Sequence, residues 1–215
     1  MKVGTLLLLV ITCCKLGSAD YLCIGKIGPM GISQSEADDI SRLIKQLHSR
    51  SQEERNETKK SLLVAAMRSP AARREVIGGL IGVLNSARRV VEGEVSFDTW
   101  AVAAQLTGEL GAEEAIDALI EYLDFSDGTY GLSLSHWPAT RAVIEMGNAA
   151  IPKLVRALEE GKASVRAKAA LALGEIGGDR SEQALEGALL TEKDEEVIFN
   201  IETSLSTISK RRRRQ

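Results

Sequence analysis

The residue types that carry most protein chemistry are scarce in this sequence of 215 residues. It contains two histidines, His48 and His136, and three cysteines, Cys13, Cys14 and Cys23. A structural zinc site needs about four such ligands close together, so none is expected. No serine lies in a Gly-x-Ser-x-Gly nucleophile elbow, and no glycine-rich phosphate-binding loop occurs. We therefore predict that the protein is not an enzyme and holds neither a metal nor a cofactor.

Acidic residues are numerous, but they recur at helical spacing, which is typical of solvated helix faces rather than of an acid–base pair. Asp124 and the pair Asp127-Gly128 resemble part of a calcium-binding loop. Their spacing differs from that of an EF-hand, and the later ligands of such a loop are absent. We interpret these residues as a polar turn.

Residues 124–137, with the sequence DFSDGTYGLSLSHW, form a polar segment rich in aromatic side chains. Six of the eight aromatic residues of the chain lie in or shortly before this segment. Long loops between repeats often carry function, and Tyr and Trp are frequent anchors of protein interfaces. We expect Phe125 and Trp137 to fold back onto the core, and Tyr130 and His136 to be exposed.

Helices must position these residues, because apolar side chains recur at three- and four-residue steps from about Gly31 onward. No sustained two-residue alternation occurs, so the pattern predicts an all-α chain. Ser35 is the expected N-cap of the first helix, since an acidic residue follows it in the first turn. Ser96 is the expected N-cap of a later helix over residues 97–110.

A short motif recurs along the chain and indicates paired helices. Gly108-Glu109-Leu110-Gly111 returns as Gly174-Glu175-Ile176-Gly177, and a weaker copy is Glu145-Met146-Gly147. The last glycines are 36 and then 30 residues apart, and each can adopt the left-handed conformation that ends a helix. A second helix is expected after each glycine, with leucines one turn apart: Leu119 and Leu123, Leu154 and Leu158, Leu185 and Leu189. These periods predict an α-solenoid of about five antiparallel helix pairs over residues 35–209.

The best-formed of these helices resembles a known repeat. Residues 164–177, with the sequence SVRAKAALALGEIG, resemble the first helix of a HEAT repeat of the short subtype named after phycobilisome lyases. The resemblance extends over 163–190, over 97–123 and, less completely, over 138–160. Trp137 and Pro138 replace the usual start of one helix, and Ile198 stands where the pattern usually has arginine.

The resemblance implies an α-solenoid that binds proteins, and we identify the chain as an exported bacterial member of this repeat family. It does not imply lyase activity, since the repeat occurs in proteins of many functions. Two alternatives stay open: a phycobilin-lyase-type enzyme or ligand-transfer factor, and a structural subunit of a cell-envelope assembly. HEAT-repeat metal-dependent hydroxylases use His-Glu pairs, and neither His48 nor His136 is followed by glutamate.

Partner binding is expected on the second helices of the pairs, which line the concave wall of such a stack, together with the 124–137 loop. The candidate residues are Asp117, Glu121, Tyr122, Tyr130, His136, Lys153 and Arg156, with Glu182 and Glu186 on the next pair. Their charges are mixed in sign, which suits a folded protein or a peptide better than nucleic acid.

The charge of the chain is divided unevenly. The formal net charge is −3, and five consecutive basic residues contribute +5, so the remaining chain carries −8: Lys210, Arg211, Arg212, Arg213 and Arg214. We predict that residues 210–215 form a disordered tail separate from the folded body, with no helix past Ser209. A weak, salt-sensitive contact with an anionic membrane is expected of such a tail.

The N-terminal residues have the pattern of an export signal. Lys2 precedes a short apolar run, and Gly17-Ser18-Ala19 supplies small residues before a cleavage point at Asp20. We predict a signal peptide over residues 1–19, an extension over 20–34, and a periplasmic or extracellular mature protein. An uncleaved anchor and lipidation at Cys13 or Cys14 are the alternatives.

Two smaller features of the exported chain stay open. Cleavage leaves Cys23 as a single thiol that either pairs with another chain or is partly buried. Asn56-Glu57-Thr58 fits the N-glycosylation acceptor pattern, which matters only in a eukaryotic secretory pathway.

Overall fold

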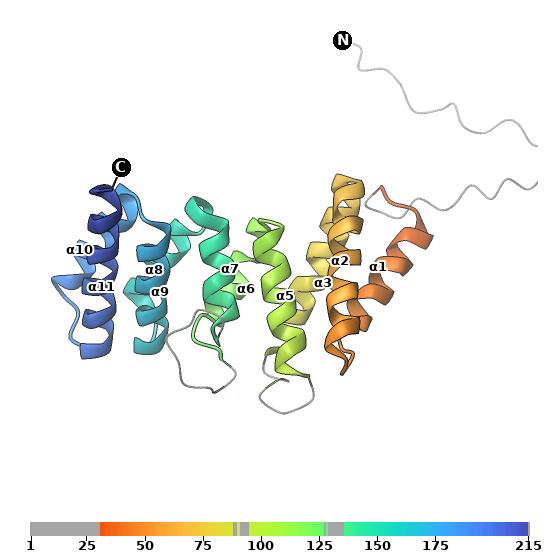
Figure 1. Ribbon diagram of the computed structural model, residues 1–215, viewed down its shortest axis with the longest axis horizontal. Helices are drawn as coiled ribbons and strands as arrows, with labels where there is room; N and C mark the ends of the chain where they lie inside the picture. The colour runs from red at the N-terminus through yellow and green to blue at the C-terminus, as the bar shows by residue number, and fades with distance from the viewer. Residues whose placement is uncertain (1–30, 88–89, 91–94, 127, 129–135, 215) are drawn as a thin grey trace, which may run out of the picture.

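The computed structural model describes residues 31–87, 90, 95–126, 128 and 136–214. Within these residues the chain forms helices joined by turns (Figure 1). The α-helices are α1 Gln34–Gln46, α2 Gln52–Arg68, α3 Pro70–Leu84, α5 Phe97–Glu109, α6 Ile116–Glu121, α7 Pro138–Met146, α8 Ile151–Glu160, α9 Ala163–Ile176, α10 Asp179–Leu189 and α11 Glu195–Arg212. Short 3-10 helices, Glu113–Ala115 and Gly147–Ala149, precede α6 and α8.

The helices stack in two layers along one axis (Figure 1). The first layer consists of α2, α5, α7, α9 and α11, and the second layer consists of α1, α3, α6, α8 and α10. Each helix contacts its partner in the other layer and its neighbours in its own layer. The prediction of an all-α solenoid with about five helix pairs is confirmed.

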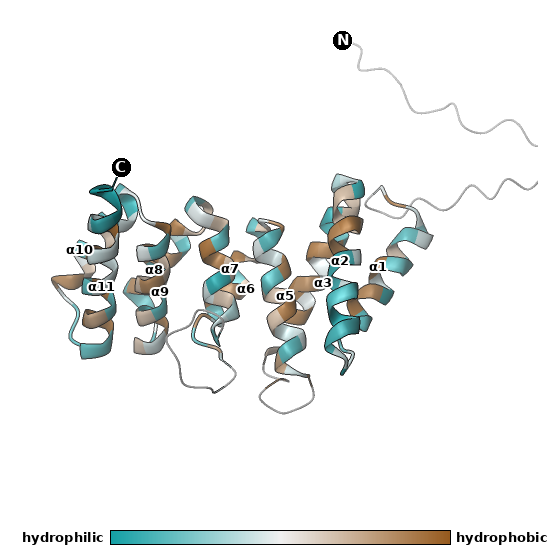
Figure 2. Cartoon of the chain, in the orientation of Figure 1, coloured by the Kyte–Doolittle hydropathy of each residue, from teal (hydrophilic) through white to brown (hydrophobic). Residues whose placement is uncertain are grey.

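One hydrophobic core runs between the two layers from Ile32 to Ile208. The leucines predicted for the second helices belong to it, since Leu119, Leu154 and Leu185 are fully buried. Individual helices carry both apolar and polar residues (Figure 2). No single helix pair encloses its own apolar side chains, so the stacking of neighbouring pairs stabilises the fold.

Hydroxyl and indole groups also join neighbouring elements inside the core. Thr99 donates to the carbonyl of Leu47 at 3.0 Å. The indole of Trp100 donates to the carbonyl of Leu84 at 2.9 Å. These bonds pair the buried Thr99 hydroxyl and Trp100 indole and fix how α5 sits on the preceding helices.

The ends of the repeats follow the local rules expected from the sequence. Ser96 caps α5, accepting a hydrogen bond from the amide of Asp98 at 3.2 Å. Gly111, Gly147 and Gly177 have φ values of 56°, 61° and 73°, so each has the positive φ that favours glycine at the end of its helix. Both predictions are confirmed.

Both expected ends of the solenoid differ from the structure. The N-cap of α1 is Ser33 rather than Ser35, and its hydroxyl accepts from the amide of Glu36 at 3.2 Å. At the other end, α11 continues past Ser209 to Arg212. The expected stop at Ser209 is therefore wrong. Basic side chains in the last turn interact favourably with the negative end of the helix dipole.

The predicted signal peptide, residues 1–19, and most of the predicted extension, residues 20–34, lie outside the described part of the chain. Cys23 lies outside it too. Across the described residues, no helix is long and apolar enough to span a membrane.

Candidate partner-binding surfaces

The predicted patch on the second helices includes one ion pair that joins two repeats. Lys153 on α8 contacts Asp117 on α6 at 2.6 Å. Arg156, also on α8, pairs with Glu160 at 2.9 Å within its own helix. Glu121 is exposed at the end of α6. The four charged residues predicted for this patch therefore lie on the neighbouring second-layer helices α6 and α8: Asp117, Glu121, Lys153 and Arg156.

Tyr122 does not project outward as expected. Its ring lies 6.1 Å from that of Trp100 and 6.3 Å from that of Phe125, and it is half-buried against the core. Burial, and then the carboxylate of Glu121, raises the pKa of its phenol. Tyr122 therefore packs as part of an aromatic cluster and offers little contact area to a partner. Tyr122 is the C-cap residue of α6, where its ring meets that of Trp100 on α5 edge to face.

The 124–137 loop is only partly described. Tyr130 lies outside the described residues. Phe125 folds back against Trp100, with ring centroids 4.9 Å apart, as predicted. His136 is half-buried rather than fully exposed, and its ring meets that of Trp137 edge to face at 6.2 Å.

The two ends of this loop are fixed on α9. Asp124 accepts hydrogen bonds from Ser164 at 2.7 Å and from Lys162 at 2.8 Å. Burial raises the pKa of the Asp124 carboxyl, but these hydrogen bonds outweigh it, and the pKa lies below its ordinary value. The ammonium of Lys168 lies 3.4 Å from the ring centroid of Trp137, and burial lowers its pKa. The loop therefore leaves and rejoins the solenoid at two anchored points.

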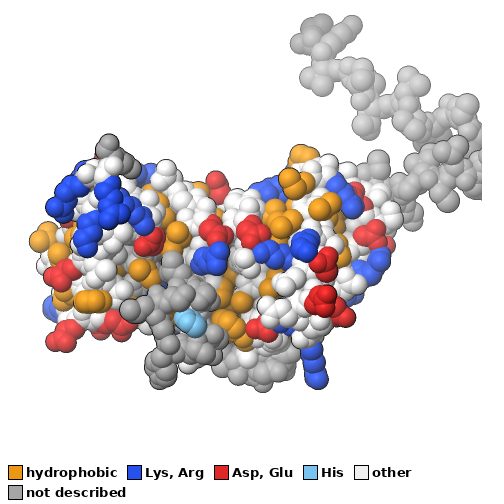
Figure 3. Space-filling view, viewed as in Figure 1, with side chains coloured by type: hydrophobic (Ala, Val, Ile, Leu, Met, Phe, Trp, Pro, Cys, Tyr) orange, Lys and Arg blue, Asp and Glu red, His pale blue; other side chains and the backbone are white. Residues whose placement is uncertain are grey.

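The basic C-terminal residues gather at one end of the first-layer face (Figure 3). Arg211 pairs with Glu175 at 2.5 Å and donates to the carbonyl of Glu175 at 2.5 Å. Arg212 pairs with Asp179 at 3.1 Å and with Glu182 at 2.5 Å.

These contacts make the prediction of a separate tail wrong. Three of its basic residues belong to α11, and two of these, Arg211 and Arg212, are bound to carboxylates on α9 and α10. Glu182, expected to face a partner, is held by Arg212. Glu186 is exposed on α10.

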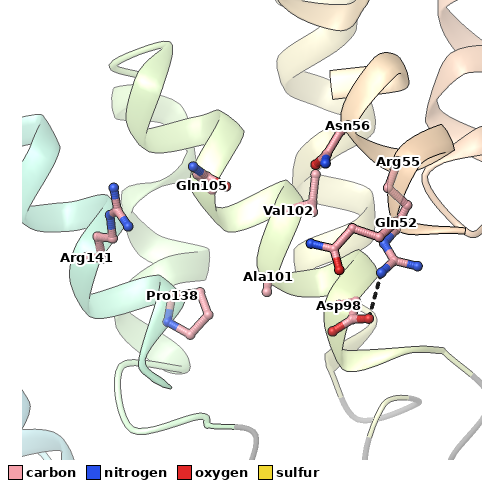
Figure 4. Close-up of a pocket in the computed structure, with 9 residues that line it drawn as sticks. All are labelled: Gln52, Arg55, Asn56, Asp98, Ala101, Val102, Gln105, Pro138 and Arg141. Carbon is pink, nitrogen blue, oxygen red and sulfur yellow. Dashed lines mark hydrogen bonds and ion pairs between the residues drawn. The ribbon is translucent and has the colours of Figure 1, made fainter. Parts of the chain in front are cut away.

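A groove that sequence reasoning missed crosses the first layer (Figure 4). It has a volume of about 270 Å³ and lies between α2 and α7, with α5 as its floor. Its lining residues are Gln52, Arg55, Asn56, Asp98, Ala101, Val102, Gln105, Pro138 and Arg141. The one signal in the sequence is the four-residue spacing of Gln52 and Asn56, which places two amide side chains on the same face of a helix.

One arginine in the groove is buried and fixed. The side chain of Arg55 is 6% exposed, and it donates to the carbonyl of Ser49 at 2.8 Å and to Asp98 at 2.7 Å. A buried guanidinium would be costly without such partners. Arg55 therefore ties α2 to α5 at this end of the groove.

The other polar groups of the groove keep open hydrogen-bonding positions. Arg141 uses its Nε to bind Glu145 at 3.0 Å, and within the described chain its two terminal nitrogens have no partner. The side-chain amides of Gln52 and Asn56 also have no hydrogen-bond partner among the described residues. The arrangement can accept a polar ligand without breaking an existing contact of Gln52 or Asn56.

The described residues contain no group of three or more His, Cys, Asp or Glu side chains that could hold a metal ion. His48 lies exposed at the end of α1, and His136 lies at the loop before α7, so the structure does not bring the two histidines together.

Comparisons with known proteins concern the second half of the chain most directly. Residues 137–206 match the family model of HEAT repeats. Among curated proteins, none matches the sequence significantly.

Two solved structures that match the chain are an engineered protein and a designed repeat protein. The chain is 23% identical to an engineered protein, with a TM-score of 0.39 over 80% of this chain and 79% of that one. It is 21% identical to a designed armadillo repeat protein in complex with the peptide (KR)4, with a TM-score of 0.38 over 81% of this chain and 83% of that one. Residues 137–206 are thus similar to HEAT repeats, and they lie within an all-α solenoid of stacked helix pairs.

Proposed function

We propose that this protein is an exported, non-catalytic scaffold that binds a protein partner through the surface of its solenoid. The observation that carries this proposal is the groove across α2, α5 and α7, where the amides of Gln52 and Asn56 and the terminal nitrogens of Arg141 have no partner among the described residues. Solenoids present such extended surfaces because each repeat contacts only its neighbours. HEAT-type repeats are used mainly for protein binding, which agrees with this interpretation.

The charges on the described surface favour a protein partner over nucleic acid. Acidic and basic side chains are mixed over most of the first-layer face, and a basic cluster lies at its C-terminal end (Figure 3). The second-layer patch pairs Lys153 with Asp117 and Arg156 with Glu160. Nucleic acid binding depends on a surface of uniformly positive charge that neutralises phosphates. A mixed surface instead gives orientation and specificity toward another protein.

The proposed location rests on the sequence of the N-terminus. Cleavage after Ala19 would release a chain that begins at Asp20 and place it in the periplasm or outside the cell. Intact-mass measurement of protein recovered from the exported fraction tests this point. A mass that corresponds to residues 20–215 is expected, and full-length protein found only in the cytosol would contradict export.

Crosslinking in intact cells of the source organism, followed by mass spectrometry, tests the binding function. We expect crosslinks that join residues of the solenoid to one recurring partner protein, and none with a variant that is unfolded by two core substitutions, Leu119→Asp and Leu173→Asp. Absence of a recurring partner would contradict the proposal. A change in visible absorbance on mixing the pure protein with a bilin would instead support the lyase-type alternative.

A weak contact with anionic membranes is a second part of the proposal. Lys210, Arg213 and Arg214 are exposed and form no ion pair within the described chain, unlike Arg211 and Arg212. Each basic residue near an anionic surface contributes about 1 kcal/mol. Three such residues give an affinity that salt should abolish.

Sedimentation with phosphatidylserine vesicles at low salt measures this contact. Replacing Lys210, Arg213 and Arg214 by glutamine should remove most of the bound fraction. The control variant carries the same charge change elsewhere, through Arg42→Gln, Lys60→Gln and Lys193→Gln. Equal loss in the two variants, or no loss in either, would show that the C-terminal residues have no specific role at the membrane.

A further inference from the structure

The groove across α2, α5 and α7 has dimensions that restrict what it can hold. Its volume of about 270 Å³ belongs to an open surface groove, so its length across the three helices is the useful dimension. Neighbouring packed helices lie about 8–10 Å apart, so crossing from α2 over α5 to α7 takes about 16–20 Å. An extended peptide advances about 3.3 Å per residue and covers this span with five or six residues.

The side chains along this path match the groups of a peptide backbone. Gln52 and Asn56 on one wall each offer a donor and an acceptor, and neither is engaged by another described residue. On the floor, Ala101 is small and Val102 is apolar, so a chain can lie close to α5. Pro138 adds an apolar contact on the opposite wall.

The charge of the groove identifies the side chain that the peptide should carry. Arg55 is already bound by Asp98 and by the carbonyl of Ser49, so it offers nothing further. Asp98 also lines the groove with its side chain 61% exposed, so an acidic group fits only at the Arg141 end. Arg141 is half-exposed, and only its Nε is engaged, by Glu145. Its two terminal nitrogens form the fork that binds a carboxylate through two parallel hydrogen bonds.

We propose that this first-layer groove binds an extended segment of a partner protein, with the peptide backbone on the amides of Gln52 and Asn56 and an acidic side chain on Arg141. The inference rests on the proposed protein-binding function and names the partner segment and its site. It places the binding surface on the layer opposite to the second-helix patch predicted from the sequence.

Fluorescence polarisation with labelled ten-residue peptides tests the inference on the full mature protein. The probes are a peptide of alternating glutamate and serine and two matched peptides in which lysine or glutamine replaces every glutamate. At low salt the acidic peptide should bind at least tenfold more tightly than the other two. Arg141→Gln should weaken its binding about tenfold. Gln52→Ala combined with Asn56→Ala should weaken it several-fold, because the backbone contacts are lost.

Arg42→Gln is the control. Arg42 is an exposed arginine on α1 that pairs with an acid of its own helix, and its substitution removes the same charge as Arg141→Gln. Its binding should equal that of the unaltered protein. Equal affinity for the acidic and basic peptides, or equal loss in Arg42→Gln and Arg141→Gln, would overturn the inference.

The same variants separate this inference from the proposed function. If crosslinking in intact cells recovers a partner equally with Arg141→Gln and with the unaltered protein, the groove is not the binding site. The proposed scaffold function is then still supported. Loss of the partner with Arg141→Gln, with unchanged circular dichroism, supports both.

Discussion

Arg166 and Glu192 connect the last repeats through a paired contact. Two nitrogens of Arg166 bind the two oxygens of Glu192 at 2.7 and 2.8 Å, and a third donates to the carbonyl of Gly161 at 2.9 Å. Glu192 also accepts from the amides of Lys193 and Asp194. The hydrogen bonds from Arg166 are the main reason why the pKa of the Glu192 carboxyl falls to about 2.

This pKa predicts how stability depends on pH. A carboxyl whose pKa is lower in the folded protein stabilises it above the ordinary pKa, near 4.5, and loses that contribution as the pH falls toward 2. Glu192→Gln should therefore cost about 1–2 kcal/mol at pH 7, since the pair is largely but not fully buried. Urea denaturation of both proteins at pH 7 and pH 2.5 measures the difference, which should shrink at the lower pH. A difference that stays constant would show that the ionised carboxyl is not the cause.

At the scale of the elements, first-layer helices approach so closely that glycine is required at the contact. A Cβ built on Gly174 of α9 would lie 2.8 Å from the Cα of Ser204 on α11. One on Gly108 of α5 would lie 2.9 Å from the Cα of Ala142 on α7. Both glycines open the repeated Gly-Glu-x-Gly motif, whose second glycine ends the helix.

Gly174→Ala should therefore destabilise the protein by about 1–3 kcal/mol, because α11 must shift to make room for a methyl group. Gly187→Ala on α10 is the matched control, since a Cβ there meets nothing within 4 Å. That control should leave stability unchanged or raise it by up to about 1 kcal/mol, as expected for alanine in a helix interior. Thermal unfolding followed by circular dichroism compares the two, and equal effects would contradict the close contact.

What could be predicted from the sequence depended on how local the cause was. Ser96 as an N-cap and Gly177 as a helix stop follow from residues a few positions away, so both were predicted correctly. The docking of Arg211 depends on Glu175, 36 residues earlier, which lies beside it only once the helices stack. For the same reason the groove was missed, since its walls come from α2, α5 and α7.

At the scale of the whole molecule, stability comes from a core shared between successive repeats. Leu173 on α9 is fully buried, whereas Leu190 at the end of α10 is 87% exposed. Leu173→Ala should cost about 2–5 kcal/mol through lost burial and the cavity left behind. Leu190→Ala should change the free energy of unfolding by less than about 0.5 kcal/mol. Urea denaturation distinguishes them, and similar costs would show that the core does not run through α9.

Site-specific photo-crosslinking in intact cells tests most directly whether the solenoid surface binds a protein. Three positions receive the photoreactive residue in turn. Gln105 lies in the groove and Asp117 lies on the second-layer patch. Glu202, on the exposed side of α11, is the control position. The account predicts a covalent adduct of defined mass from the Gln105 position and none from the Glu202 position. An adduct from the Asp117 position alone would move the binding surface to the second layer. Folded, exported protein that gives no adduct at Gln105 or Asp117 would contradict a partner-binding scaffold.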